Sequence, residues 1–216
     1  MAIFEGFVSA GDLTLAALKA SCGQRKPETP SPESVAAMTE HFSSIGYRAD
    51  VPKLYRALIG YGAAELDGVN TRGLCLKGDC GVGKTLGVQI LAEHFKWVFT
   101  SATDYPRAYL ENPRAAFDRI ADGMDFFERP APVVVIDDLG SEPRTTRRFG
   151  DELNVMEYVL ERRYRMFQRC GARTVITTNL RDGELARRYG ARIDDRFNEM
   201  MQFVFVSGES LRRFAP

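Results

Sequence analysis

The sequence lacks an excess of either charge and is poor in cysteine. Lys and Arg together number 29, Asp and Glu also number 29, and each half of the chain is balanced in the same way. This balance excludes a basic tail or a wholly basic domain of the kind that coats nucleic acid, and leaves open only a local basic patch. The four cysteines include no CxxC pair, so the usual spacing of a zinc site is missing as well.

Long apolar runs are also missing. No stretch reaches the roughly 18 apolar residues that a membrane-spanning helix needs. The first residues do not place a basic segment before an apolar one, so we expect neither a signal peptide nor a membrane contact. With its cysteines free, the protein is expected to be cytoplasmic. The 216 residues, of which 44% are hydrophobic and 27% charged, suffice for one packed domain with an appendage.

The sequence divides into a short N-terminal extension and a core. Residues 23–34 are polar and contain three prolines, which is typical of a linker. The apolar spacing after this linker predicts a short helix, for which Ser34 is the expected N-cap. We therefore expect an extension over residues 1–50, a candidate for binding a partner, and a core over residues 51–216. The first helix of the core is expected near Pro52, because proline suits a first helical turn.

The core alternates short apolar runs with longer amphipathic segments. Fully apolar strands separated by helices indicate a parallel sheet that is covered on both faces. The prediction is therefore an α/β fold with three layers and a five-stranded parallel sheet. The expected strands are 73–78, 96–102, 131–138, 173–179 and 201–208. The expected helices are 85–95, two short pieces within 106–123, and a long helix over 149–170.

A glycine-rich loop follows the first expected strand. Residues 78–85 read GDCGVGKT, in which Gly78, Gly83, Lys84 and Thr85 fit the GxxxxGK[ST] pattern. Glycine lets backbone N–H groups turn toward a phosphate, and the helix that follows adds the positive end of its dipole. Lys84 is expected to reach the β- and γ-phosphates of ATP, and Thr85 to bind Mg²⁺. The remaining residues predicted to bind the nucleotide through this loop are Asp79, Cys80, Gly81, Val82 and Leu86.

The segment VVVIDD, residues 133–138, consists of four apolar residues followed by two carboxylates. A buried parallel strand delivers its last side chains to the carboxyl edge of the sheet, where ligands of α/β proteins bind. Asp137 is therefore predicted to hold Mg²⁺, mostly through water. Asp138 is predicted to polarise an attacking water. Two alternatives stay open: Asp138 caps the next turn, or Glu142 takes the role of the base.

Asn179 ends another expected strand, in RTVITTNL. A polar side chain at that edge can contact the γ-phosphate or orient a water molecule, and we predict this catalytic role for Asn179. The alternative is an asparagine that only stabilises the turn at the end of the strand.

The order of these motifs resembles the core of an AAA+ ATPase, and more narrowly the DnaC/IstB family of helicase loaders and transposon ATP-binding helpers. Over roughly residues 50–216, the matching blocks are IDDLGSE, TTNL, GARIDDRF and VSGESLR. The resemblance implies an ATPase that is weak alone and stimulated by DNA or a partner. It also implies a homo-oligomer that loads or remodels a helicase or a transposase on DNA. The ten residues after Val206 leave no room for the separate helical lid of larger AAA+ proteins.

The resemblance also assigns arginines. Arg196 takes the place of the arginine finger that acts on the nucleotide of a neighbouring subunit. Arg192, one turn earlier on the same helical face, takes the place of the neighbouring motif arginine and is expected to bind the nucleotide. Arg212 takes the place of a γ-phosphate sensor in its own subunit, although Arg213 is adjacent. The alternative for Arg196 is a surface arginine that pairs with an acid close by in the sequence. The acids considered for that pairing are Asp194, Asp195 and Glu199.

Contact with single-stranded DNA and two other functions remain open. Residues 142–173 hold eight arginines against five acids, and the polar segment EPRTTRRFG follows the acid strand. These arginines suggest phosphate contacts, whereas a solvated helix face is the alternative. The P-loop alone also allows a small-molecule phosphotransferase, or a nucleotide-binding scaffold with little hydrolysis. A phosphotransferase would need an acceptor pocket, for which no sequence motif is evident.

Overall fold

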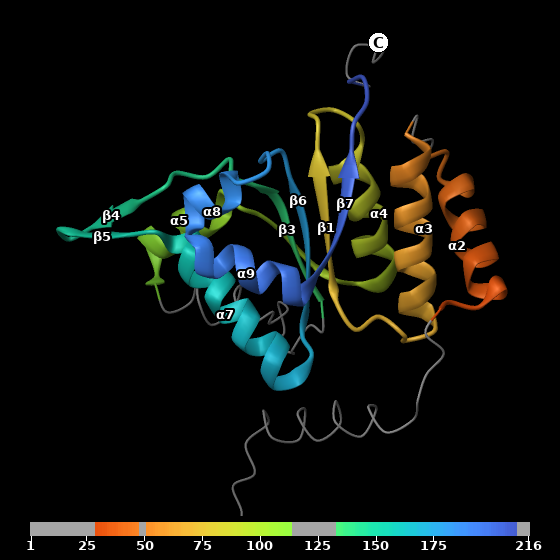
Figure 1. The fold of residues 1–216 in the computed structure, drawn as a ribbon, viewed down its shortest axis with the longest axis horizontal. Coiled ribbons are helices and arrows are strands. Elements are labelled where there is room, and N and C mark those ends of the chain that lie inside the picture. The colour runs from red at the N-terminus through yellow and green to blue at the C-terminus, as the bar shows by residue number, and fades with distance from the viewer. Residues whose placement is uncertain (1–28, 48–50, 114–132, 211–216) are drawn as a thin grey trace, which may run out of the picture.

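The computed structural model of the chain describes residues 29–47, 51–113 and 133–210, and it confirms the predicted α/β class. A five-stranded parallel sheet lies at the centre (Figure 1). Its strand order is β2-β3-β6-β1-β7. Its strands are β1 (Gly73–Gly78), β2 (Val98–Ser101), β3 (Val133–Leu139), β6 (Arg173–Thr178) and β7 (Met201–Val206). All five expected strands are therefore present.

Helices cover both faces of the sheet and complete the predicted three layers (Figure 1). One face carries α2 (Pro32–Ser44), α3 (Pro52–Leu66) and α4 (Lys84–Phe95). The other carries α5 (Asp104–Glu111), α7 (Val155–Cys170), α8 (Glu184–Tyr189) and α9 (Ala191–Met200). Consecutive strand residues serve the two cores in turn: Leu74 faces the α4 side and Cys75 the α7 side.

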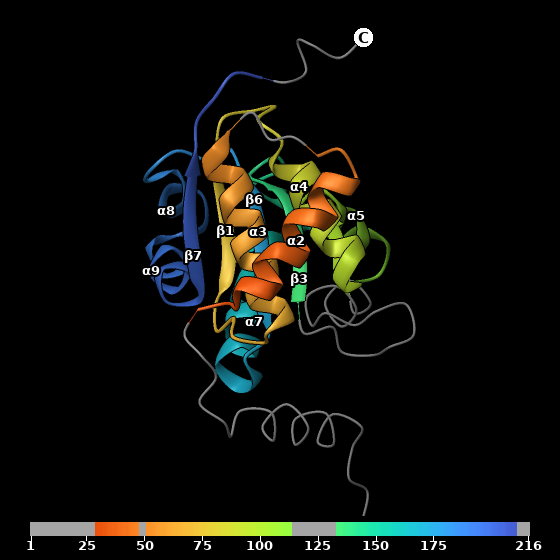
Figure 2. The ribbon, with the colours of Figure 1, turned by 90° about the vertical axis from the view of Figure 1, so that its right-hand side faces the viewer.

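The described part of the predicted extension packs into the core. Met38 and Phe42 of α2 are buried in the same cluster as Leu58 of α3, and Figure 2 shows the two helices side by side. The N-cap of α2 is Ser31 rather than Ser34: the Ser31 side chain accepts a hydrogen bond from the Ser34 N–H. The helix begins earlier than predicted because Pro32 fits its first turn, so it uses the last residues of the predicted linker.

The helix predicted over 149–170 begins later, at Val155. A β-hairpin of β4 (Thr146–Arg148) and β5 (Asp151–Leu153) precedes it and extends away from the sheet (Figure 1). Asn154 sets the start of α7, because its side chain accepts a hydrogen bond from the Glu157 N–H. Leu153, which the predicted helix included, belongs to β5 and packs against the core. The helix prediction is therefore wrong for residues 149–154 and holds for the rest of the segment.

The remaining expectations concern the short helical pieces within 106–123, a separate helical lid and a membrane-spanning helix. The first of the two helical pieces within 106–123 corresponds to α5, whereas most of the second lies outside the described residues. Within the described ranges, no separate helical lid follows β7. No described helix is both long and apolar enough to cross a membrane.

Candidate functional site

The glycine-rich loop links the end of β1 to the start of α4. Gly78, Gly81 and Gly83 have positive φ angles of 150°, 79° and 95°. A Cβ atom on Gly78 would lie 1.7 Å from the Val206 carbonyl oxygen, and one on Gly81 would lie 2.1 Å from Ser210 Oγ. Gly78 is thus required both for its backbone conformation and for space, whereas Gly81 and Gly83 have backbone angles that favour glycine.

The loop is fixed from both sides. The Asp79 N–H donates to the Val206 carbonyl at 3.1 Å, and the Gly208 N–H donates to the Asp79 carboxylate at 3.3 Å. From the segment before α3, the Tyr47 hydroxyl donates to the Gly83 carbonyl at 3.2 Å. Burial raises the pKa of Tyr47 to about 12, so the hydroxyl stays a donor. Sequence reasoning missed Tyr47, because nothing near it in the chain signals contact with the loop.

Lys84 is nearly buried and folds over the loop. Its Nζ donates to the carbonyls of Gly78 at 2.9 Å and Asp79 at 2.6 Å, and to Asn179 Oδ1 at 2.8 Å. Burial lowers the pKa of Lys84, and negative groups that include Asp138 oppose this effect. The lysine is therefore a desolvated cation held at the carboxyl edge of the sheet, and any anion that enters the loop meets it.

A bulge in β3 brings both strand-end carboxylates to the same place. In a regular strand, neighbouring side chains point to opposite faces. Here the pairing of β3 with β6 shifts between Ile136 and Leu139, and Asp138 has a φ of 56°. Asp137 and Asp138 consequently border the same pocket as Lys84. The uncommon backbone angle of Asp138 thus lies where the sequence predicted the catalytic carboxylate.

Two threonines of β6 stabilise this bulge. The Thr177 hydroxyl accepts a hydrogen bond from the Asp138 N–H at 2.8 Å and donates to Asp137 Oδ1 at 2.6 Å. The Thr178 hydroxyl donates to the Leu139 carbonyl at 2.6 Å. Sequence reasoning singled out only Asn179 in this segment, although two polar residues at the end of an apolar strand were the available signal. Thr177 orients the predicted magnesium ligand.

The pocket has a volume of about 570 Å³ and joins most of the predicted residues. It is lined by Cys80, Gly81, Gly83, Lys84, Thr85, Leu86, Gln89, Asp137, Asp138, Thr177 and Asn179. Asn179 links two of them, because its Nδ2 donates to Asp138 Oδ1 at 3.1 Å while its Oδ1 accepts from Lys84. Val82 is fully buried in the core. Gln89 was not predicted, and it faces the pocket one helical turn after Thr85.

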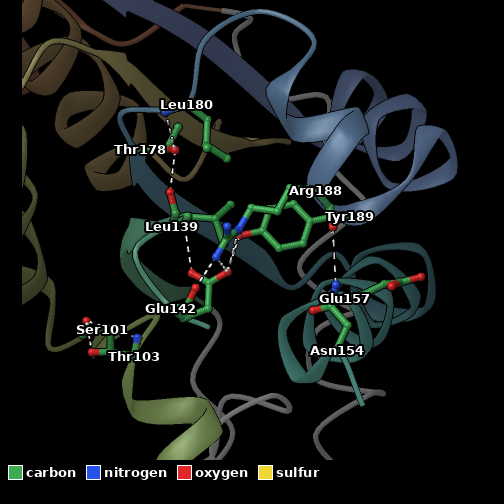
Figure 3. A network of polar contacts seen from close by, with 11 residues as sticks. Ser101, Thr103, Leu139, Glu142, Asn154, Glu157, Thr178, Leu180, Arg188 and Tyr189 are labelled. Atoms are coloured by element: carbon green, nitrogen blue, oxygen red, sulfur yellow. Dashed lines mark hydrogen bonds and ion pairs between the residues drawn. The ribbon is translucent and has the colours of Figure 1, made fainter. Parts of the chain in front are cut away.

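Glu142 does not compete with Asp138 for the pocket. Its side chain is 1% exposed and contacts Arg188 and Tyr189 of α8 (Figure 3). It also accepts a hydrogen bond from the Gly140 N–H at 2.8 Å. Burial and the nearby Glu142 charge raise the pKa of Tyr189. Glu142 therefore anchors the segment after β3 to α8, and the alternative that it acts as the base does not fit this geometry.

Arg196 and Arg192 lie on α9 and are not among the described residues that line the pocket. Arg196 Nη1 donates to Glu161 Oε1 of α7 at 2.9 Å, and its guanidinium lies 4.6 Å from the centre of the Tyr164 ring. Arg192 is exposed and 3.8 Å from the same Glu161 oxygen. The acid that pairs with Arg196 is thus Glu161, which is remote in sequence from the acids considered above. Arg212 lies outside the described residues.

Glu161 acts as a shared anion for these arginines. Partial burial acts to raise the pKa of Glu161, but the hydrogen bond and charge of Arg196 and the charge of Arg192 outweigh it, so the pKa lies below its ordinary value. Arg165 adds a further contact at 3.1 Å. The result is an arginine-rich surface of α7 and α9 that Glu161 holds in place.

The pocket fits a nucleotide phosphate chain and Mg²⁺. The loop and the first turn of α4 offer backbone N–H groups beside the ammonium group of Lys84. Within the described ranges, no group of three or more His, Cys, Asp and Glu side chains could hold a metal ion alone. Mg²⁺ usually takes one or two carboxylates together with water and phosphate oxygens. Thr85 and Asp137, which border the same pocket, match that requirement.

Comparison with known proteins identifies the fold. No protein-family model and no curated protein sequence matches the chain. The crystal structure of the DnaC helicase loader is similar with a TM-score of 0.51 and 22% identity, and the match covers 77% of this chain and 98% of the chain in that structure. The replication initiator DnaA, solved with AMPPCP and single-stranded DNA, is similar with a TM-score of 0.50 and 14% identity, and the match covers 75% of this chain and 48% of the chain in that structure. The chain therefore has an α/β P-loop fold of the AAA+ type, similar to that of DnaC, as its motifs predicted.

Proposed function

We propose that the protein binds and hydrolyses ATP as an AAA+ protein of the DnaC/IstB type, and that it loads or remodels a helicase or a transposase on DNA. The observation that carries this proposal is the pocket at the carboxyl edge of the sheet. There the loop lysine Lys84, the carboxylates Asp137 and Asp138 and the amide Asn179 border one cavity. The similarity of the fold to DnaC favours the loader role over other P-loop activities.

Thr85 and Asp137 are the proposed magnesium ligands. Thr177 fixes one oxygen of Asp137 by a hydrogen bond and thereby orients the carboxylate. When bound, Mg²⁺ would neutralise negative charge on the β- and γ-phosphates. Lys84 would exchange its contacts with the Gly78 and Asp79 carbonyls for phosphate oxygens. The loop glycines allow the close backbone approach that this exchange needs.

Asp138 is the proposed base that polarises the attacking water, with Asn179 as its partner. The hydrogen bond from Asn179 holds the Asp138 carboxylate, and Asn179 also contacts Lys84. A water held between Asp138 and Asn179 would face the end of the phosphate chain. Because aspartate reaches less far than glutamate, we propose slow turnover for the isolated protein and faster turnover with DNA or a partner.

Arg196 is the proposed arginine finger in a homo-oligomer. It lies on α9, apart from the pocket of its own subunit, which fits action on the pocket of a neighbour. Its side chain is 14% exposed and paired with Glu161, so phosphate of a neighbouring subunit must compete with that carboxylate. Arginine suits this role because its guanidinium is planar and always charged. Arg192, which is exposed one turn earlier, is proposed as its helper.

A mixing experiment tests the action of Arg196 between subunits. Lys84→Met and Arg196→Ala proteins are each expected to lose ATP turnover by about 10³-fold, since one lacks the phosphate lysine and the other the finger. In an equal mixture, about one quarter of the active sites combine an intact Lys84 with an intact neighbouring Arg196, because heterologous contacts pair subunits at random. Phosphate release by the mixture should therefore recover to about one quarter of the wild-type rate.

The control is a mixture in which recovery is impossible. Lys84→Met and Asp138→Asn both damage the same site, so no subunit in their mixture has a complete one. We expect no recovery from this pair. The finger assignment fails if the mixture with Arg196→Ala also stays inactive while gel filtration shows that the two variants assemble together.

A further inference from the structure

The turn of the β4–β5 hairpin carries an aromatic residue that the turn itself does not favour. Arg148 pairs with Asp151, so Phe149 and Gly150 form a two-residue turn, with φ angles of 52° and 94°. Two positive φ angles define the type I′ turn, in which Asn-Gly is preferred. A bulky residue at the first position is strained, and the Phe149 side chain is also 93% exposed. Strain together with an exposed apolar ring suggests a function at this tip.

Two arginines precede Phe149 in β4 and, as neighbouring residues of a strand, they point to opposite faces of the hairpin. The Arg148 guanidinium carbon lies 4.7 Å from the centre of the Phe149 ring, and Arg148 Nε donates to the Leu110 carbonyl of α5 at 3.3 Å. Arg147 points to the other face with a side chain that is 81% exposed, and it pairs with Glu152 at 3.2 Å. An exposed ion pair of this kind contributes little to stability, so Arg147 can exchange Glu152 for another anion at little cost.

We propose that the hairpin tip, residues 147–150, binds single-stranded nucleic acid. One base stacks on the Phe149 ring, and Arg147 and Arg148 pair with the phosphates on either side of it. This inference rests on the proposed function, which brings the protein to DNA. A single strand fits better than a duplex because the faces of paired bases are already stacked. The hairpin extends away from the sheet and its helices, which leaves its tip open to a strand (Figure 1).

A base that stacks on Phe149 has to be distinguished from a groove of another protein that buries Phe149 as an apolar side chain. Phe149→Asn removes the ring and also supplies the preferred turn sequence, so the melting temperature should stay the same or rise. Phe149→Trp keeps an aromatic face, whereas Phe149→Leu keeps only apolar surface. Arg56→Ala is the matched control for the arginines, because Arg56 is exposed and belongs to α3. This helix and the hairpin lie on opposite sides of the molecule (Figure 1).

The test is fluorescence anisotropy of a labelled 20-nucleotide oligothymidine and of a duplex of equal length. We expect Phe149→Asn to weaken single-strand binding by about 5- to 150-fold, because the contact with one stacked base is lost. Phe149→Trp and Arg56→Ala should bind as the wild type does. The double variant Arg147→Ala, Arg148→Ala should reduce the slope of log K against log salt by about 1.4, because two phosphate contacts are lost.

Each of the other outcomes would overturn one part of the proposal: the hairpin tip as the site, the stacking, or the contact with DNA. Equal affinity of Phe149→Asn and wild type for the oligonucleotide would rule out the tip and leave the proposed function standing. Full affinity of Phe149→Leu would indicate an apolar contact and would overturn stacking. If the wild type binds no oligonucleotide, the DNA contact of the proposed function fails along with this inference. The ATP-dependent rise in melting temperature, measured on the same samples, shows whether nucleotide binding itself is intact.

Discussion

Lys84→Met is expected to remove most of the rise in melting temperature that ATP causes in the wild type. With free ATP at one hundred times Kd, bound nucleotide stabilises the wild type by about 2.7 kcal/mol. Loss of two charge-assisted hydrogen bonds, each worth at least about 1.5 kcal/mol, weakens binding by more than about 100-fold. At the same ATP concentration, the variant then gains only about 0.4 kcal/mol.

The melting temperature of the free Lys84→Met protein should remain close to that of the wild type. Lys84 is a desolvated cation whose pKa is lowered by burial, so its removal relieves a desolvation cost while it breaks hydrogen bonds to Gly78, Asp79 and Asn179. Differential scanning fluorimetry with and without Mg²⁺ and ATP measures both effects. Lys96→Met is the matched control, because Lys96 is exposed at the other end of α4. A full ATP-dependent rise in Lys84→Met would show that this lysine does not contact the nucleotide.

Glu142→Ala is expected to reduce the free energy of unfolding by about 3 kcal/mol, because it removes a buried carboxylate and leaves the mostly buried guanidinium of Arg188 without its partner. Arg188 is 13% exposed and contacts both the Glu142 carboxylate and the Glu142 carbonyl (Figure 3). Tyr189 loses its acceptor at the same time. Chemical denaturation followed by circular dichroism measures the change. Glu157→Ala, at an exposed carboxylate of α7, should cost less than about 1 kcal/mol. A similarly small loss for Glu142→Ala would contradict the anchoring role.

The same carboxylate provides a functional contrast with Asp138. Glu142→Gln keeps an acceptor for Tyr189 and should leave ATP turnover per folded molecule unchanged. Asp138→Asn, in the pocket, should lower turnover by about 10²- to 10⁴-fold while ATP still binds, because it removes the proposed general base. Single-turnover phosphate release separates these effects from nucleotide binding. The reverse pattern would assign the base to Glu142 and would reject the site as described.

The sheet and the centre of the site were predictable because their signals are local. Each strand appears as an apolar run, and the spacing of Gly78, Gly83 and Lys84 lies within eight residues. The carboxyl ends of parallel strands meet at one edge, so Asp137 and Asn179 could be placed together without coordinates. The observed pocket joins them to Lys84.

The missed contacts depend on partners that the chain brings together only by folding. Glu142 is 46 residues from Arg188, and Arg196 is 35 residues from Glu161. Neither pair leaves a pattern along the sequence, so the acids near Arg196 in the chain were considered and Glu161 was not. The hairpin was missed because its turn is Phe-Gly rather than Asn-Gly, and because Leu153 continues the apolar spacing of α7.

Isothermal titration calorimetry of the wild-type chain with ATP, ADP and AMP in the presence of Mg²⁺ tests the central claim most directly. If Lys84, Thr85 and Asp137 surround the phosphates, ATP and ADP should bind at one site per chain and AMP should bind far more weakly. Removal of Mg²⁺ with a chelator, or Asp137→Asn, should weaken ATP binding. Absence of heat with every adenine nucleotide, or equal affinity for AMP and ATP, would contradict the account.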